Sequence, residues 1–190
     1  MNYLAHSLLS FSDGQLVGNM IADYIKNRDR ASFPEEIQNG IALHRAIDSF
    51  TDSHPEISKA KKVFQPLVRL YAGAFVDVSL DYFVAHSLRE NELKLHAEKS
   101  YDVLWKHEQY LPENFKKVLY HMEKDNWLLN YRKDWGIQFS LKNVVRKAKY
   151  LDDSIDVFPL FLEDKTKLKT HYDIFFPELF TFAQTYVLKK

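Results

Sequence analysis

The stretch Ile41–Asp52 constrains this chain most, because it places His44, Asp48 and Asp52 four residues apart. An α-helix turns about 100° per residue, so each step of four residues rotates a side chain by only about 40° and advances it one turn. The imidazole and the two carboxylates therefore share one stripe of a predicted helix. The neighbouring arc of that helix is apolar and is predicted to face a core: Leu43, Ala46, Ile47 and Phe50.

This acidic row needs a positive partner, because burying carboxylates beside a core is costly without one. A divalent cation is the simplest partner, since imidazole nitrogen and carboxylate oxygen are suitable ligands for Mn²⁺, Fe²⁺ or Zn²⁺. The alternative is that Asp48 and Asp52 are solvated, that Asp52 acts at the helix C-terminus and that His44 is a surface histidine. Spacing alone does not decide between the two, so the rest of the chain has to.

Few residues in this sequence break helices. Only 5 Gly and 6 Pro occur among 190 residues, too few for the many tight turns of an all-β fold. No segment shows a convincing strand pattern, and the length suits one domain with a substantial core. We therefore expect an all-α, single-domain helical bundle that spans residues 1–190.

Local signals divide the chain into successive helices. Ser32 and Glu35 fit a capping box that begins the third helix, and Pro66 is expected to kink the fourth. Trp135-Gly136 is expected to break the pattern, and Ser140 fits a cap for the helix that follows. The expected helices are 2–11, 15–25, one from the capping box to about residue 51, one beginning at 53–56, 75–86, 91–111, 113–126, a short turn at 127–131, one after residue 140, 154–174 and 177–188.

Charge and cysteine content exclude several classes of function. Lys plus Arg equals Asp plus Glu at 26 each, so no overall field attracts nucleic acid or a membrane surface. Cysteine is absent, which excludes disulfides, zinc–thiolate sites and a cysteine nucleophile. No apolar run reaches the roughly 18 residues of a membrane span, and the N-terminal stretch lacks the basic start of a signal peptide. We expect a soluble, cytoplasmic protein with no membrane insertion and no nucleic-acid partner.

Two further predicted helices carry acids of the same kind. Asn19 and Asp23 are one turn apart in the second helix, Asp77 and Asp81 are four residues apart in the fifth, and His6 is nearby in sequence. Helical bundles build metal sites from side chains that project inward from facing helices. We therefore expect these acids to converge with the first row around one or two metal ions. The alternative is that they are separate solvated faces.

A carboxylate-rich site without thiols indicates a particular chemistry. It suits a hard or borderline ion that keeps some of its waters, which favours Mn²⁺, Mg²⁺ or Fe²⁺ over structural zinc. Such an ion supplies hydroxide at neutral pH and withdraws charge from a phosphoryl oxygen, so phosphoester hydrolysis is the natural reaction. The nucleoside-triphosphate and dinucleotide motifs are absent. His54 and His86 are further candidates for proton transfer or phosphate contact, although histidines in such places are more often structural.

Several blocks of the sequence resemble a known family. They are Met-Asn-Tyr-Leu-Ala-His at 1–6, Gly-Asn-Met-Ile-Ala-Asp at 18–23, Phe-Pro at 33–34, Gly-Ile-Ala-Leu-His-Arg-Ala-Ile-Asp-Ser-Phe-Thr-Asp at 40–52 and Asp-Val-Ser-Leu-Asp-Tyr-Phe at 77–83. In this order they look like the bacterial acyl carrier protein phosphodiesterases, a branch of the HD-type metal-dependent phosphohydrolases. The resemblance is strong through residue 90 and rests afterwards mainly on length and helical character.

This resemblance implies an all-α, HD-phosphohydrolase-like fold and dependence on Mn²⁺. It also implies hydrolysis of the phosphodiester that joins 4′-phosphopantetheine to a serine of acyl carrier protein, which yields the apo form. One departure is plain, because the chain contains no His-Asp dipeptide and the ordinary HD signature does not transfer. The matching positions suggest these ligands or near-ligands: His6, Asp23, His44, Asp48, Asp52, Asp77 and Asp81.

Together these arguments predict a site. We expect a divalent metal, with Mn²⁺ first and Mg²⁺ or Fe²⁺ as alternatives, and catalytic or orienting roles for four residues: His44, Asp48, Asp52 and Asp77. The expected metal ligands are His6, Asp23, His44, Asp48 and Asp81.

The expected protein partner is holo acyl carrier protein. Such carriers are acidic, so a basic patch should dock them. The first candidate patch is Lys59, Lys61, Lys62 and Arg69, and the second is Lys142, Arg146, Lys147 and Lys149. Two alternative functions stay open at this point: an HD-type phosphohydrolase for a nucleotide or other small phosphoester, and a non-catalytic helical adaptor.

Overall fold

The computed structural model describes residues 2–188, and within that range the chain is all-α with no strand, as expected. Four short 3₁₀ turns interrupt the α-helices: η1 (Ala22–Tyr24), η2 (Asn27–Ser32), η3 (Arg69–Tyr71) and η4 (Glu108–Tyr110). The α-helices are α1 (Tyr3–Leu8), α2 (Asp13–Ile21), α3 (Glu35–Ser53), α4 (Pro55–Val68), α5 (Ala72–Ser87), α6 (Glu90–Lys106), α7 (Glu113–Lys124), α8 (Trp127–Asn130), α9 (Asp134–Lys147), α10 (Phe158–Glu163) and α11 (Lys165–Leu188).

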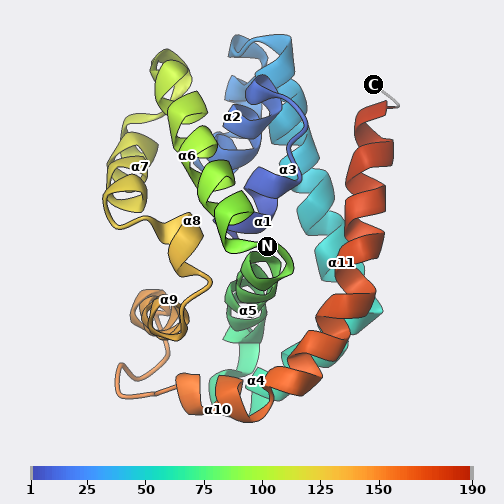
Figure 1. Cartoon of the computed structure of the whole chain (residues 1–190), viewed down its shortest axis with the longest axis vertical. Helices are drawn as coiled ribbons and strands as arrows, with labels where there is room; N and C mark the ends of the chain where they lie inside the picture. The colour runs from blue at the N-terminus through green and yellow to red at the C-terminus, as the bar shows by residue number, and fades with distance from the viewer. Residues whose placement is uncertain (1, 189–190) are drawn as a thin grey trace.

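Helix α1 lies inside the bundle (Figure 1). It packs against α2 and α5, while α11 runs along α3, α4 and α5, and α9 packs on α5. One continuous apolar core extends from Leu4 in α1 to Ala183 in α11. Because α1 is buried along most of its length, its polar side chains also face other helices, and His6 is one of them.

Helices α2 and α3 approach each other unusually closely through two glycines. A Cβ atom on Gly18 would collide with the carbonyl oxygen of Ile37, and one on Gly40 would collide with the backbone of Gln15. Only glycine allows two helix backbones to come this near without a shift. This close approach lets the side chain of Asn19, next to Gly18 on α2, reach His44 on α3.

Several expected helix boundaries are wrong, and tertiary contacts explain why. Ser32 does not form the capping box, because its hydroxyl donates to the carbonyl of Asp29 at 2.7 Å within η2, and α3 begins after Pro34. Gly136 does not break a helix but lies in the first turn of α9, where a Cβ would meet the carbonyl of Asn130. Pro177 does not separate two helices either.

The C-terminal helix shows how packing outweighs local signals. Phe175, Leu179 and Ala183 are buried on one face of α11, on both sides of Pro177, so core contacts hold the helix together across the proline. Residues 154–157, which were expected to be helical, precede α10 and form no helix. Residues 91–111 are also shorter as a helix than expected, since α6 ends at Lys106.

Among residues 2–188, no helix combines the length and the apolar composition that crossing a membrane requires. The expectation of a cytoplasmic location stays a prediction.

Candidate metal centre

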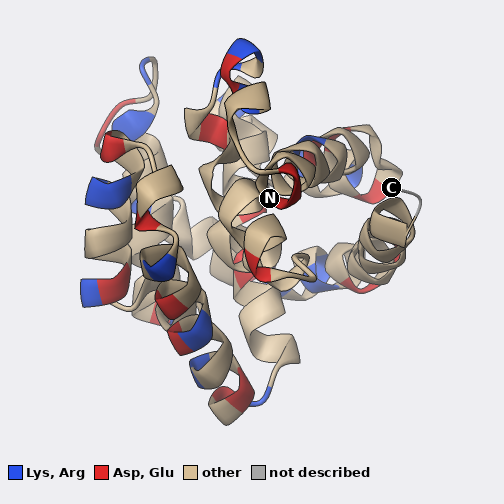
Figure 2. Cartoon of the chain, turned by 90° about the horizontal axis from the view of Figure 1, so that it is seen from above, with Lys and Arg blue, Asp and Glu red and all other residues tan. Residues whose placement is uncertain are grey.

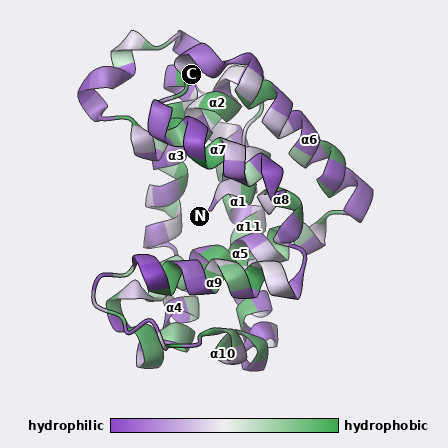
Figure 3. Ribbon diagram, turned by 90° about the vertical axis from the view of Figure 1, so that its left-hand side faces the viewer, coloured by the Kyte–Doolittle hydropathy of each residue, from purple (hydrophilic) through white to green (hydrophobic). Residues whose placement is uncertain are grey.

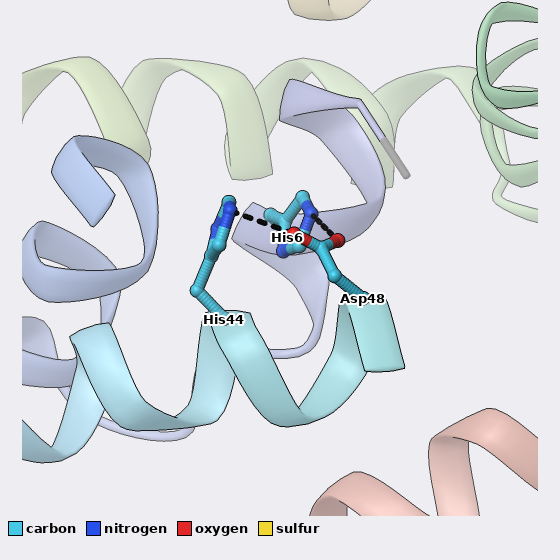
Figure 4. Close-up of side chains that lie close together, drawn as sticks. All are labelled: His6, His44 and Asp48. Carbon is cyan, nitrogen blue, oxygen red and sulfur yellow. Dashed lines mark ion pairs between the residues drawn. The ribbon is translucent and has the colours of Figure 1, made fainter. Parts of the chain in front are cut away.

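Three side chains, one from α1 and two from α3, meet in the interior of the bundle (Figure 4). The Asp48 carboxylate faces the Nε2 atoms of two imidazoles: its Oδ1 is 3.3 Å from Nε2 of His6, and its Oδ2 is 3.1 Å from Nε2 of His44. One ligand atom from each residue lies within 4.8 Å of the others. In the part of the chain that the structure describes, no other group of His, Cys, Asp and Glu meets this geometry. The three residues therefore form a candidate metal site.

The two histidines of this site are buried and stacked. Their ring centroids are 4.0 Å apart with an interplanar angle of 17°, and neither residue is more than 6% exposed. Burial, reinforced by the neighbouring His44, lowers the pKa of His6 to about 4. His6 is therefore neutral at physiological pH and keeps a nitrogen lone pair for a metal ion.

His44 has the opposite electrostatic setting. Burial alone lowers its pKa, but the hydrogen bonds to Asp23 and Asp48 outweigh burial and raise the pKa to about 9. Burial likewise works to raise the pKa of Asp48, yet the two neighbouring imidazoles lower it well below its ordinary range. In the metal-free protein, the His44 imidazolium thus offsets part of the charge of Asp23 and Asp48, and a bound divalent ion would take over that role.

Asn19 determines which nitrogen of His44 is free. The side-chain amide of Asn19 donates to the backbone carbonyl of His6 at 2.9 Å, so its oxygen faces Nδ1 of His44 at 3.1 Å. Nδ1 must therefore carry the hydrogen, which leaves Nε2 as the atom that can bind a metal. Asn19 is fully buried and was given no role from the sequence. Its position one turn before Asp23 was the only signal.

The buried ring nitrogens of His6 indicate that the residues present fit a metal ion. His6 is 3% exposed, and neither of its ring nitrogens makes a hydrogen bond of proper geometry among the described residues; Nε2 has only the 3.3 Å contact with Oδ1 of Asp48. A buried polar atom left without a partner costs about 1 to 3 kcal/mol. A metal ion at Nε2 would give that nitrogen a well-directed partner, and two imidazoles with one carboxylate are a suitable donor set for a borderline divalent ion.

Asp23 reaches the same cluster from η1, where its Oδ1 lies 3.2 Å from Nε2 of His44. Its side chain is 79% exposed, so it approaches from the solvent side. The hydrogen bond to His44 holds its pKa below the ordinary value. Asp23 is thus next to the site but outside the group of three.

Asp81 was predicted to bind the metal, but its carboxylate contacts the backbone of α1. Its Oδ2 accepts from the backbone N–H of Leu4 at 2.9 Å, and its Oδ1 accepts from the N–H of Ala5 at 3.2 Å. These donors belong to the first turn of α1, whose N–H groups have no partner within the helix and attract an acid. Burial raises the pKa of Asp81 to about 7. In this arrangement, Asp81 anchors α1 and thereby places His6.

The remaining candidates lie farther from the cluster. Oδ1 of Asp52 is 3.1 Å from Nζ of Lys61, and the ring of His54 lies 3.2 Å from Glu178. His86 donates from Nδ1 to the carbonyl of Tyr82 at 2.9 Å. The structure therefore does not bring these three side chains to the candidate site.

A cavity of about 560 Å³ opens at the centre. His6, Asn19, Asp23 and His44 line one wall, Asp77 on α5 lines another, and residues of α8 and α9 close the far side. A second hollow of about 650 Å³ contains Asp52, Lys61 and Arg69. Ala74 and Asp77 belong to both hollows, so the two adjoin.

Comparison with known proteins identifies the family of the chain. The family model described as acyl carrier protein phosphodiesterase matches residues 1–179. Proteins of that name are similar to this chain: the one from Enterobacter sp. (strain 638) is 29% identical over 91% of this chain and 89% of its own. The one from Pectobacterium atrosepticum is 31% identical over 69% of this chain and 70% of its own.

A third relative of the same name, from Klebsiella pneumoniae subsp. pneumoniae, is 28% identical and covers 97% of this chain and 98% of its own. No solved structure matches the chain, so the likeness to the HD-type fold stays a prediction. The family match spans nearly all of the described helices, including those that form the centre and line the cavity. This chain belongs to the acyl carrier protein phosphodiesterase family.

Proposed function

We propose that this chain hydrolyses the phosphodiester between 4′-phosphopantetheine and a serine of holo acyl carrier protein and releases the apo form. The family match supports the reaction. The observation that carries the proposal within the molecule is the convergence of His6, His44 and Asp48 beside a cavity large enough for a small-molecule arm.

The proposed metal is Mn²⁺, with Mg²⁺ or Fe²⁺ as alternatives. His6 and His44 would hold it through Nε2, and Asp48 through its carboxylate. A divalent ion at such a site lowers the pKa of a bound water and withdraws charge from a phosphoryl oxygen. To bind a metal ion through Nε2, His44 would have to release to solvent the proton that it shares with Asp23, 3.2 Å away. In this proposal Asp81 keeps its place at the N-terminus of α1.

The leaving serine oxygen needs a proton. Asp77 lies in the cavity wall, on α5, one turn before Asp81, and we propose that it orients the substrate or passes that proton. Asp52 lies in the adjoining hollow with Lys61. Its proposed contribution is to hold that lysine in place.

The adjoining hollow is the proposed docking place for the acidic carrier protein. Lys61 and Arg69 line it, and Leu70 beside them is fully exposed. Lys59 is 2.6 Å from Glu56 and Lys61 is paired with Asp52, so Lys62 and Arg69 are the cations of this patch without an ion pair among residues 2–188. Both signs of charge are interspersed over the helices (Figure 2), so docking depends on such local patches.

The second basic patch is an alternative docking place at the other side of the cavity. None of its four cations has an ion pair among the described residues, and Lys147 lines the cavity itself. Charge reversal separates the two choices: Arg69→Glu should raise the KM for holo acyl carrier protein if the first patch docks it, and Lys147→Glu if the second does. These four cations are Lys142, Arg146, Lys147 and Lys149.

The function is tested by metal analysis of the purified protein together with a gel assay for conversion of holo to apo acyl carrier protein. We expect bound divalent metal and conversion that is lost in chelator and restored by Mn²⁺. Faster hydrolysis of cyclic nucleotides would favour the alternative phosphohydrolase. Carrier protein that binds without being converted, equally well in Asp48→Ala, would favour the helical adaptor.

A further inference from the structure

The far wall of the cavity is one stripe of helix α9. Trp135, Phe139, Asn143 and Lys147 all line the cavity and follow each other at intervals of four residues. Each step of four residues turns a side chain by only about 40°, so this row winds slowly around the helix while its members still line one cavity. Figure 3 faces this helix, with α5 behind it. Three more lining residues lie on the adjacent row of the same helix: Gly136, Ser140 and Val144.

This stripe is separate from the face that α9 uses for stability. Ile137, Leu141 and Val145 are at most 1% exposed and pack in the core. Trp135 and Phe139, by contrast, are 59% and 52% exposed, although both are large and apolar. The fold therefore does not need these two aromatic side chains for its core, and neighbouring exposed aromatics in a cavity wall are typical of a ligand surface.

The order of groups along the stripe indicates the chemistry of the ligand. Aromatic rings come first, then the hydroxyl of Ser140 and the amide of Asn143. Aromatic faces accept methyl groups and planar amides, and a hydroxyl and a carboxamide can donate to and accept from amide groups. A flexible chain with methyl and amide groups matches this order, whereas a bare phosphodiester does not need it.

We propose that the α9 stripe binds the pantetheine arm of the substrate and makes the enzyme selective for phosphodiesters that carry this arm. This inference rests on the proposed function. The phosphodiester would lie at the wall of His6 and His44, and the arm would extend over Trp135 and Phe139, which share the same cavity. These aromatic residues are specificity-determining residues, since they contact the part of the substrate that does not react.

A binding experiment tests this inference without catalysis. Pantetheine, which has no phosphate, is titrated into the full-length protein without added metal and followed by calorimetry. We expect binding to the wild type and an affinity about tenfold or more lower in Trp135→Ala and Phe139→Ala. Tyr120→Ala is the matched control, because Tyr120 is a 56% exposed aromatic residue that does not line the cavity. Absent binding, or equal binding by all variants, overturns the inference.

A kinetic comparison separates this inference from the proposed function. For Phe139→Ala with Mn²⁺, we expect kcat/KM for holo acyl carrier protein to fall about tenfold or more, mainly through KM. Hydrolysis of bis(p-nitrophenyl) phosphate, a diester without the arm, should change less than about twofold. Equal losses on both substrates would mean that α9 acts only on the structure of the site. If the wild type binds pantetheine but does not convert holo acyl carrier protein, the proposed function fails and the arm site stands.

Discussion

Two clusters of histidines and acids in this protein contain similar residues but differ in how these residues share partners. At the candidate metal centre, His6 and His44 share a single acid, because the carboxylate of Asp48 faces both rings. The second cluster joins α4 to α11: His54 is 3.2 Å from Glu178, and His171 is 2.7 Å from Glu56.

In the second cluster each histidine has its own acid. Glu56 also pairs with Lys59, at 2.6 Å, so a cation of the protein itself offsets the charge of this acid. Phe50 and Phe175 pack against the ring of His54, so this ring has a structural role between helices. The comparison teaches that composition does not distinguish a metal site from a structural network. A metal site is distinguished by several ligand atoms that converge on one point, one of which lacks a hydrogen bond of proper geometry.

The largest expected difference between the clusters is in activity. Asp48→Ala should lose metal and lower kcat by about a thousandfold or more, because the carboxylate links both imidazoles and a metal ion is expected to provide the attacking water. Metal content and conversion of holo acyl carrier protein measure this, with circular dichroism to show that the fold is kept. His54→Ala is the matched control and should keep metal and most of its activity. A metal-free but fully active Asp48→Ala would break the comparison.

The second expected effect is on pH dependence. Since the pKa of His44 is raised to about 9, protons compete with the metal below that pH, and Mn²⁺ affinity should rise about tenfold per pH unit from pH 7 toward 9. In metal-free protein the sign is opposite: the raised pKa stabilises the fold below 6.5, and this contribution is lost as the pH rises through about 9.

Calorimetric titration with Mn²⁺ at several pH values checks this dependence. Asp23→Asn should flatten it, because the hydrogen bond that helps to raise the His44 pKa is weakened. An affinity that does not change between pH 7 and 9 would contradict the assignment of His44 as a ligand.

The third prediction concerns Asn19, which contacts His44 at the candidate metal centre. Asn19→Ala removes the acceptor that holds Nδ1–H of His44 and should weaken Mn²⁺ binding by about 10- to 100-fold. Asn19→Ser, with a shorter polar side chain, tests whether any acceptor suffices. Unchanged affinity in the alanine variant would show that packing alone orients His44.

The smallest effect is expected at the second cluster. His171→Ala removes the partner of Glu56 and one contact between α4 and α11, so the melting temperature should fall by a few degrees. Metal content and kcat should stay within about twofold of the wild type. A loss of metal in this variant would show that the two clusters are coupled through α3 and α11.

The part of the site that lies within one helix could be predicted from sequence. His44 and Asp48 are adjacent on α3 because a four-residue step covers one turn and little rotation. Asp52 illustrates the limit of the same rule. Two such steps rotate it by about 80° from His44, and it meets Lys61 on α4 instead of the centre.

The residues that join from other helices could not be placed by spacing. Asp81 has the same four-residue spacing from Asp77 as His44 from Asp48, yet its carboxylate meets the first backbone N–H groups of α1. Sequence gives no distance between a carboxylate and donors that are 76 or 77 positions away. Asn19 was missed for a related reason, since its role depends on the close crossing at Gly18 and Gly40.

The sequence by itself determined the all-α class, through few glycines and prolines and a helical apolar period, and it determined the pair of donors on α3, because these properties depend on neighbouring residues. The resemblance named His6 as a ligand, but only the tertiary structure placed it beside that pair, set Asp81 at the start of α1 and brought α9 to the cavity. These outcomes depend on how helices far apart in the chain cross, and a crossing is set by packing and close backbone contact, which no local period encodes.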